Sequence, residues 1–152
     1  MDVETFLKDA GVKYEEHEHP VVYTAQELAA QEHISGDAVA KVVAVQADGR
    51  YVLCVLPASG RIDLDKLGKG LKAKKCRLAD EGELAKLFPD VEVGAEPPIG
   101  EPYGLETVAD ERLTRCEAIT FNAGSHRKSI RMAYADYARL AAPKIMDFSV
   151  HL

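Results

Sequence analysis

The sequence predicts an α/β (α+β) fold in which helices surround a mixed, largely antiparallel central sheet. Its 152 residues are 47% hydrophobic and 29% charged, the balance of a globular domain with one core. The chain contains both segments with the period of an amphipathic helix and short runs rich in β-branched residues. These segments do not follow the strict βαβ order of a parallel sheet, so most strands should pair antiparallel. We therefore expect a single domain over residues 1–152.

The first part of the chain predicts two helices with a strand between them. Apolar residues within 3–10 fall on one helical face, and the glycine that follows ends that helix. Residues 14–18 have the pattern of a short strand. Thr24 and Glu27 form a T-x-x-E capping box, which predicts a second helix to about residue 32.

The clearest hairpin is predicted by residues 41–47 and 50–56, which are rich in β-branched and aromatic side chains. Asp48 and Gly49 between them are typical of a type I′ turn. Both strands are apolar on both faces, so we expect them in the middle of a covered sheet.

Shorter helices are predicted after the hairpin. Asp63 or Asp65 can cap a helix that runs to about residue 71. Asp80 and Glu83 form a second capping box, which predicts one more helix.

The last part of the chain predicts a long irregular connection followed by strands and a helix. Prolines and glycines exclude a helix over residues 91–103. Residues 116–122 and 129–133 predict two strands joined by a polar turn. Residues 134–141 predict a helix, and residues 144–148 predict an edge strand.

The composition excludes several classes of protein. With 19 basic and 25 acidic residues the net charge is −6, so no DNA partner is expected. No apolar run approaches the roughly 18 residues of a membrane span, and the acidic start does not resemble a signal peptide. We expect a cytoplasmic protein with no membrane partner. Three cysteines without a C-x-x-C pair, and a His17-x-His19 pair without a third ligand, predict no metal site and no cofactor.

The strongest basic patch lies between Arg61 and Arg77. Within it, Lys72, Lys74 and Lys75 could contact nucleic-acid phosphates locally. A solvated helix face is the alternative, and charge alone favours that alternative.

Lys41 is the unusual residue of the hairpin, because it heads a strand that is otherwise apolar. Its ammonium group could hold a phosphate, polarise a carbonyl or, if desolvated, act as a nucleophile. The alternative is a lysine whose charged end extends to solvent from the end of a strand.

Two polar or glycine-rich segments could complete a site. Residues 94–100 form a stiff loop with a glycine at each end, which can present backbone N–H groups to an anion or a carbonyl oxygen. Asn122, Gly124, Ser125 and His126 form a turn that offers an amide, a hydroxyl and an imidazole. Each segment taken alone is more typical of an ordinary surface connection, and no G-K-[ST] or G-x-S-x-G motif is present.

The order of these features resembles the YbaK/prolyl-tRNA-synthetase insertion-domain family of aminoacyl-tRNA editing enzymes. Lys41 heads an apolar hairpin, a G-x-x-x-P-x-G loop follows at residues 94–100, and F-N-A-G-S-H stands at residues 121–126. The similarity extends over nearly the whole chain, from H-E-H-P at residues 17–20 to the D-F pair at residues 147–148. It implies that residues 1–152 are one editing domain.

The resemblance implies a free-standing deacylase that hydrolyses the ester between a wrong amino acid and the 3′ end of a tRNA. The family's invariant lysine falls on Lys41, and its G-x-x-x-P loop falls on Gly94 and Pro98. The turn glycine of the family falls on Gly124. With Gly100 at the end of the loop, Lys41, Gly94 and Pro98 form the expected catalytic site.

Two departures from the family pattern bear on the amino acid that is removed. The cysteine-removing branch has a tyrosine where His17 stands and an acidic residue where Ser129 stands. Removal of cysteine is therefore less expected. The turn at residues 121–124, with K-S-I at residues 128–130, resembles the branch that edits serine and threonine, so these two are favoured, with alanine next. The candidate substrate-binding residues are His17, Tyr23, Asn122, Gly124, Ser125, His126 and Ser129.

The expected mechanism assigns Lys41 a fixed positive charge that anchors a phosphate or the ester carbonyl. Backbone N–H groups of residues 94–100 would hold the carbonyl oxygen as charge develops. Water would attack with help from the substrate's ribose hydroxyl, and His126 is the reserve candidate for a general base.

The expected partner is the acceptor end of a tRNA that carries a wrong amino acid, and an aminoacyl-tRNA synthetase is a further candidate. Both a monomer and a homodimer are compatible with the sequence. Two other functions stay open: a non-catalytic tRNA- or nucleotide-binding module, and a small-molecule hydrolase or Schiff-base enzyme that uses Lys41 as nucleophile.

Overall fold

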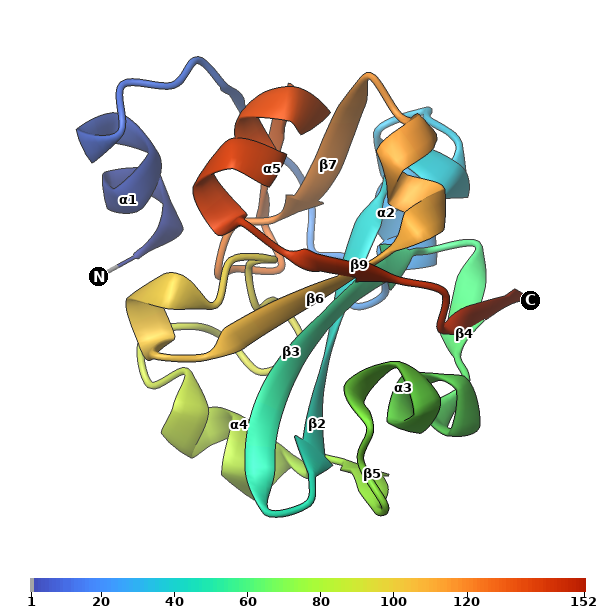
Figure 1. The fold of residues 1–152 in the computed structure, drawn as a ribbon. Coiled ribbons are helices and arrows are strands. Elements are labelled where there is room, and N and C mark those ends of the chain that lie inside the picture. Colours follow the sequence, from blue (N-terminus) through green and yellow to red (C-terminus); the bar gives the residue numbers. More distant parts are fainter. Residues whose placement is uncertain (1) are drawn as a thin grey trace.

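A five-stranded sheet forms the centre of the computed structural model, which describes residues 2–152 (Figure 1). The helices are α1 (Val3–Asp9), α2 (Ala25–Gln31), α3 (Leu64–Leu71), α4 (Glu81–Leu87) and α5 (Tyr134–Ala141). The strands are β1 (Glu15–Glu18), β2 (Ala40–Ala47), β3 (Arg50–Pro57), β4 (Gly60–Ile62), β5 (Cys76–Leu78), β6 (Glu106–Asp110), β7 (Ala118–Asn122), β8 (Lys128–Ala133), β9 (Lys144–Met146) and β10 (Ser149–His151). Short 3-10 turns are η1 (Gly36–Ala38), η2 (Glu101–Tyr103) and η3 (Glu111–Arg115).

The strand order of this sheet is β5-β2-β3-β6-β9, so the predicted hairpin of β2 and β3 lies in its interior. Asp48 and Gly49 both have positive φ, 48° and 88°, as a type I′ turn requires. A three-stranded antiparallel sheet, β1-β8-β7, and a β4–β10 pair complete the fold. Only β3–β6 and β6–β9 pair in parallel among the strand pairs of residues 2–152. The predicted fold class, with its largely antiparallel strands, is confirmed.

The two larger sheets meet where β2 begins. A parallel bridge joins Val39, just before β2, to Thr120 in β7, and both residues are buried. The start of β2 is therefore held beside the three-stranded sheet, whereas its end reaches the opposite side of the molecule.

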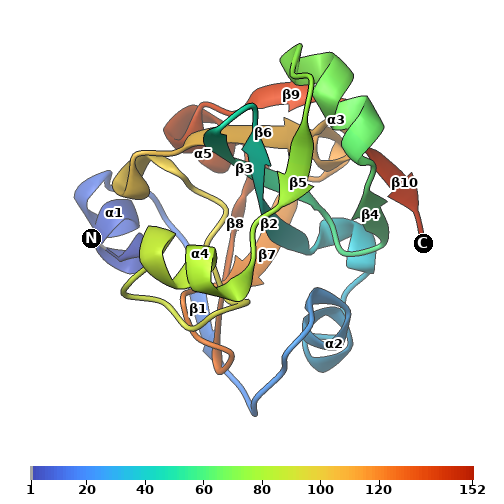
Figure 2. The ribbon, with the colours of Figure 1, turned by 90° about the horizontal axis from the view of Figure 1, so that it is seen from below.

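Three apolar clusters fix α1, α2, α3 and α5 on the sheets. Leu67 of α3 packs with Phe148 against one side of the five-stranded sheet. Tyr137 of α5 packs in a second cluster, which also holds α1, and Leu28 of α2 lies in a third. Two views show α1 and α4 toward the N-terminal side and α3 toward the C-terminal side (Figures 1 and 2).

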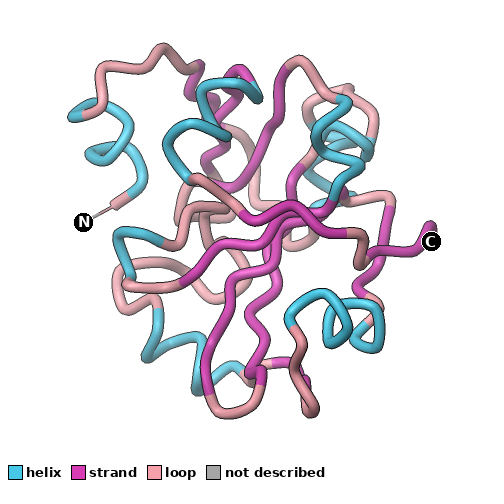
Figure 3. The backbone as a smooth tube through the Cα atoms, in the orientation of Figure 1, coloured by secondary structure: helices cyan, strands magenta, loops and turns pink. Residues whose placement is uncertain are grey.

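The connection from α4 to β6 is the longest irregular stretch of the fold (Figure 3). A helix was predicted to be excluded over residues 91–103, but the last three form the 3-10 turn η2. Pro102 lies in the first turn of η2, where its missing N–H has no helical partner to lose. The exclusion is therefore correct for residues 91–100 and wrong for residues 101–103.

The two predicted capping boxes differ in the structure. At α4, Asp80 and Glu83 each bond the other's backbone N–H, which completes the box. At α2, the Thr24 hydroxyl accepts the Glu27 N–H at 3.0 Å, but the Glu27 carboxylate accepts from the Thr24 hydroxyl instead of the backbone. Both helices nevertheless begin where the patterns place them.

Candidate functional site

A cavity of about 150 Å³ lies where β2 begins. It gathers residues from four distant segments: the start of α2, the start of β2, the irregular connection before β6, and the end of β7. Its lining residues are Ala25, Ala40, Lys41, Val42, Gly94, Glu96 and Asn122. The structure thus brings together three residues of the predicted site, Lys41, Gly94 and Asn122. We call this space the Lys41 cavity.

Lys41 supplies a positive charge to this cavity. It is the second residue of β2 and lies opposite Leu56 of β3, which fixes its backbone in the sheet. Its side chain is partly buried, and this burial lowers the pKa of the ammonium group. Within residues 2–152 no carboxylate forms an ion pair with Lys41, so its charge is available to a ligand.

The loop of residues 94–100 uses most of its N–H groups internally. The Gly94 N–H donates to Oε1 of Glu96 at 3.0 Å, and the Gly100 N–H donates to Oγ1 of Thr107 at 2.9 Å. The Ala95 N–H donates to the Glu92 carbonyl oxygen, and the two prolines have no N–H.

Glu96 is consequently the loop residue that can offer a backbone donor at the cavity. Its N–H and that of Ile99 are the two in the loop without a hydrogen-bond partner among residues 2–152, and only Glu96 lines the cavity. We expected several N–H groups of the loop to face a carbonyl oxygen, but only the N–H of Glu96 is available at the cavity.

Gly94 also shows why the loop begins with glycine. Its φ of +92° is a left-handed conformation that favours glycine, and a Cβ there would lie 3.3 Å from Cε1 of His126. Pro98 and Gly100, by contrast, are buried and do not line the cavity. The Pro98 carbonyl accepts from the Tyr137 hydroxyl at 2.7 Å, and a Cβ on Gly100 would lie 2.5 Å from the Leu105 carbonyl oxygen. Both residues hold the loop in place.

The predicted turn after β7 is tied to the same loop by backbone hydrogen bonds. The Gly124 N–H donates to the Ala95 carbonyl at 3.0 Å, and the Glu92 N–H donates to the Gly124 carbonyl at 2.9 Å. The Glu92 carboxylate accepts from the His126 N–H at 3.1 Å and from the Ser125 hydroxyl at 3.4 Å. These bonds make the loop and the turn one connected unit.

His126 packs against the loop and the turn and does not line the Lys41 cavity. Only 8% of the residue is exposed, and its Nε2–H donates to the Val93 carbonyl at 2.9 Å. Tyr23, which is 69% exposed, covers the ring at a centroid distance of 5.2 Å. These positions favour a role for His126 in supporting the loop over its reserve role as general base.

Asn122, Ser129 and His17 form one row across the three-stranded sheet, because Asn122 pairs with Ser129 and Ser129 pairs with His17. Only Asn122 lines the cavity, and its side-chain oxygen is buried without a hydrogen-bond partner in residues 2–152. Ser129 and His17 both bond Oε1 of Glu32, at 2.7 and 3.0 Å. Burial opposes the charge of Glu32, but these hydrogen bonds hold its pKa below the ordinary value.

Two carboxylates, Glu32 and Glu96, were missed by the sequence analysis. Glu32 could not be found, because its contact with Ser129 spans 97 residues. Glu96 carried a signal, since it is a charged residue beside two prolines in a loop that is otherwise uncharged. His17 and His19 do not gather a metal site: in the part of the chain that the structure describes, no group of three or more His, Cys, Asp or Glu residues could hold a metal ion.

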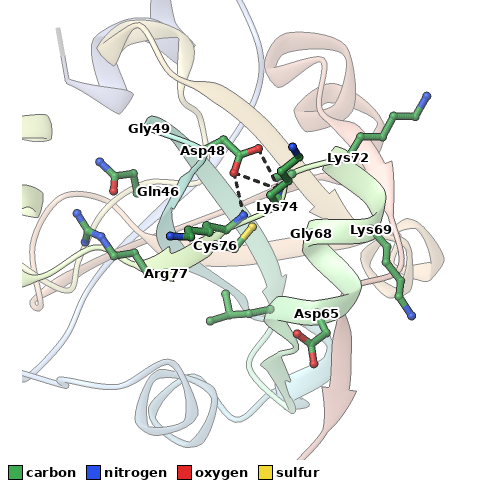
Figure 4. Close-up of a pocket in the computed structure, with 13 residues that line it drawn as sticks. Gln46, Asp48, Gly49, Asp65, Gly68, Lys69, Lys72, Lys74, Cys76 and Arg77 are labelled. Atoms are coloured by element: carbon green, nitrogen blue, oxygen red, sulfur yellow. Dashed lines mark hydrogen bonds between the residues drawn. The ribbon is translucent and has the colours of Figure 1, made fainter.

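Part of the predicted basic patch lines a second and larger cavity, of about 1050 Å³, between α3 and β5, whereas Arg61 and Lys66 lie outside it (Figure 4). The Asp48 carboxylate holds its rim by accepting the N–H groups of Lys74 and Lys75, at 2.9 and 2.8 Å. Lys69 and Lys72 extend outward from the α3 side, and Arg77 lies on the other side (Figure 4). We call this space the basic cavity; its cationic residues are Lys69, Lys72, Lys74, Lys75 and Arg77.

The remaining predicted residues of the turn border a third cavity, of about 600 Å³. Gly124 and Ser125 line it together with the acidic N-terminal segment and Arg127. Neither residue lines the Lys41 cavity. Separately, none of the helices within residues 2–152 has the length and apolar character needed to cross a membrane.

The chain is similar to proteins of a known family. Residues 19–140 match the family model of the aminoacyl-tRNA editing domain. The chain is also similar to the multifunctional Ser/Thr-tRNA deacylase ProXp-y of Escherichia coli K12 and of E. coli O157:H7, with 36% identity over 112 residues. The match covers 72% of this chain and 66% of each relative, slightly less than two thirds of their length.

Solved structures support the fold. A candidate trans-editing enzyme for prolyl tRNA synthetase superposes with a TM-score of 0.85 at 22% identity, over 97% of this chain and 94% of that one. A hypothetical protein of known crystal structure gives a TM-score of 0.89 at 21% identity, over 97% and 99% of the two chains.

Proposed function

Because the chain belongs to the aminoacyl-tRNA editing domain family, we propose that it is a deacylase that removes wrong amino acids from tRNA. In this proposal residues 1–152 act as one editing domain, and water cleaves the ester that joins the amino acid to the 3′-terminal ribose. The observation that carries the proposal is the Lys41 cavity, where an unpaired ammonium group, a free backbone N–H and an unpaired amide oxygen meet.

The chemistry asks little of the protein, since an aminoacyl ester is already activated. Placement of the ester and stabilisation of the developing negative charge supply most of the rate gain. Lys41 provides the charge, because partial burial strengthens its attraction for an oxyanion or phosphate. The N–H of Glu96 supplies a hydrogen bond to the carbonyl oxygen. No protein side chain has to act as base if the ribose hydroxyl next to the ester guides the water.

The size of the cavity and the position of Asn122 favour a small substrate with a hydroxyl group. A space of about 150 Å³ accommodates the side chain of serine, threonine or alanine. The unpaired side-chain oxygen of Asn122 can accept a hydrogen bond from the hydroxyl of serine or threonine. Ser129 and His17 lie in the same row as Asn122 and bind Glu32, outside the cavity. Serine and threonine are therefore the preferred substrates, alanine is next and cysteine is less favoured.

The tRNA would contact the basic cavity with its phosphates while its 3′ end enters the Lys41 cavity. Gln46 of β2 lines the basic cavity, and Lys41 lies five residues before it on the same strand. Five strand residues span roughly 17 Å, so one acceptor end could reach both places. Lys72, Lys74 and Lys75 are the proposed phosphate contacts, and their local grouping fits a protein whose net charge is −6.

A panel of tRNAs charged with serine, threonine, alanine or cysteine tests this function. We expect release of serine and threonine to be fastest, alanine slower and cysteine slowest, followed as loss of labelled amino acid from the tRNA. A tRNA carrying its correct amino acid is the control and should stay charged. Failure to hydrolyse any member of the panel would contradict the deacylase proposal and leave a tRNA-binding module.

A further inference from the structure

Glu96 is a buried carboxylate that the mechanism above uses only through its backbone. The residue is 5% exposed, yet it lines the Lys41 cavity. One oxygen, Oε1, accepts the Gly94 N–H at 3.0 Å, which orients the carboxylate at the cavity wall. No lysine, arginine or histidine of residues 2–152 forms an ion pair with it.

Lys41 shares the cavity but does not neutralise Glu96. Both residues line the same small space, but within residues 2–152 no ion pair joins them. The cavity therefore presents a positive and a negative group that are kept apart. A buried carboxylate without a cation is unfavourable, so a ligand that brings a cation to Glu96 would bind strongly.

We propose that Glu96 binds the α-ammonium group of the amino acid while Lys41 and the Glu96 N–H face the ester side. This inference rests on the proposed deacylase function and extends it. An aminoacyl ester carries its ammonium group one carbon from the carbonyl, so a single cavity can hold both ends. Hydrogen bonds between charged groups are shorter and stronger than those between neutral groups, which makes the ammonium an effective handle.

A consequence of this arrangement is selection for a free amino group. A peptidyl or formylated ester has a neutral amide in place of the ammonium and would leave Glu96 without a cation. The cavity would therefore spare tRNA that carries a growing peptide and act on tRNA that carries a single amino acid.

The alternative is that Glu96 only ties down Gly94, and Glu96→Gln separates the two roles. Glutamine keeps a side-chain oxygen that can accept the Gly94 N–H, but it removes the negative charge. Glu101→Gln is the matched control, because Glu101 is an exposed carboxylate in η2, on the same connection, and does not line the cavity. The thermal midpoints of both variants report any general loss of folding.

The test compares hydrolysis of seryl-tRNA with that of N-acetyl-seryl-tRNA. We expect the wild-type protein to prefer the free amine, and Glu96→Gln to lose about tenfold or more on seryl-tRNA while its rate on the acetylated substrate changes little. Glu101→Gln should behave as wild type. An equal loss on both substrates would overturn the proposal, because loss of a base or of loop structure acts on both.

A binding measurement makes the result independent of catalysis. The probes are adenosine analogues in which serine, or N-acetyl-serine, is attached to the 3′ position through a stable amide. We expect the wild-type protein to bind the free-amine probe about tenfold more tightly, and Glu96→Gln to bind both probes alike. If hydrolysis fails but this preference is present, the deacylase proposal is wrong and the ammonium site stands. Equal binding of the two probes by the wild-type protein would overturn the ammonium site whatever the hydrolysis result.

Discussion

The two ends of β2 present opposite kinds of site. At its start, the Lys41 cavity measures about 150 Å³ and contains single groups that are partly or fully buried and unpaired. At its end, the basic cavity measures about 1050 Å³ and carries five exposed cationic side chains, of which Arg77 is paired with Glu83 (Figure 4). One site is small and partly buried, whereas the other is broad and exposed.

This difference suggests a separate role for each cavity: hydrolysis of the ester in the Lys41 cavity and binding of the tRNA in the basic cavity. Charges act strongly over short distances in a partly dry cavity, because little water weakens their field. Exposed lysines act through many small contributions that dissolved salt screens. A change in the Lys41 cavity should therefore alter the rate of hydrolysis and the choice of substrate. A change in the basic cavity should alter tRNA affinity and its dependence on salt.

The largest expected effect is that of Lys41→Ala. Removal of one group that stabilises an oxyanion typically lowers kcat by about 100- to 1000-fold, and we expect a fall of that order here. Single-turnover deacylation of seryl-tRNA measures it. Lys13→Ala, at an exposed lysine near the N-terminus, is the control and should retain its rate. Near-normal hydrolysis by Lys41→Ala would remove Lys41 from the site.

A smaller effect is expected from Gly94→Ala, compared with Gly49→Ala. Both glycines have positive φ, 92° and 88°, so alanine should destabilise the fold by about 1–2 kcal/mol in each case. Only at Gly94 would the new Cβ meet another residue, His126, and shift a loop that lines the cavity.

Denaturant unfolding and deacylation distinguish the two variants. We expect similar losses of unfolding free energy, but a loss of activity of roughly tenfold or more for Gly94→Ala alone, because small misplacements of catalytic groups are costly. Equal activity of the two variants would show that the loop geometry is not needed for hydrolysis.

The parts of the fold that the sequence predicts well depend on neighbouring residues. Asp48 and Gly49 set the hairpin turn, and Asp80 with Glu83 sets the start of α4, because each motif satisfies its own backbone. β6 was not predicted, since its pairing with β3 joins Glu106 to Val52 far along the chain. Its five residues include three polar ones and lack the alternation that marks a strand.

In the candidate site, too, residues marked by a local pattern could be predicted, whereas those that depend on distant contacts could not. Lys41 stands out in the sequence as a charge at the head of an apolar strand, and the structure places it in a cavity. Glu32 and its contacts with His17 and Ser129 depend on how α2 lies against the three-stranded sheet, which no local pattern encodes. The glycines of residues 94–100 mark this loop in the sequence, whereas the position of the Glu96 side chain at the cavity is seen only in the structure.

The smallest effect per residue is expected in the basic cavity. Charge reversal of Lys72, Lys74 and Lys75 together should weaken tRNA binding at low salt by several-fold for each lysine, because each contributes one screened contact to a phosphate. The slope of log affinity against log salt should decrease by about two to three, as fewer counterions are released on binding.

Filter binding across a salt series measures both quantities, and single-turnover hydrolysis at saturating protein measures the chemical step. The step itself should change little, since these lysines do not line the Lys41 cavity. Charge reversal of Lys8 and Lys13, near α1, is the control and should leave the salt slope unchanged. An unchanged slope in the triple variant would identify the three lysines as solvated surface, whereas a large fall in the saturated rate would show that attachment and chemistry are coupled along β2.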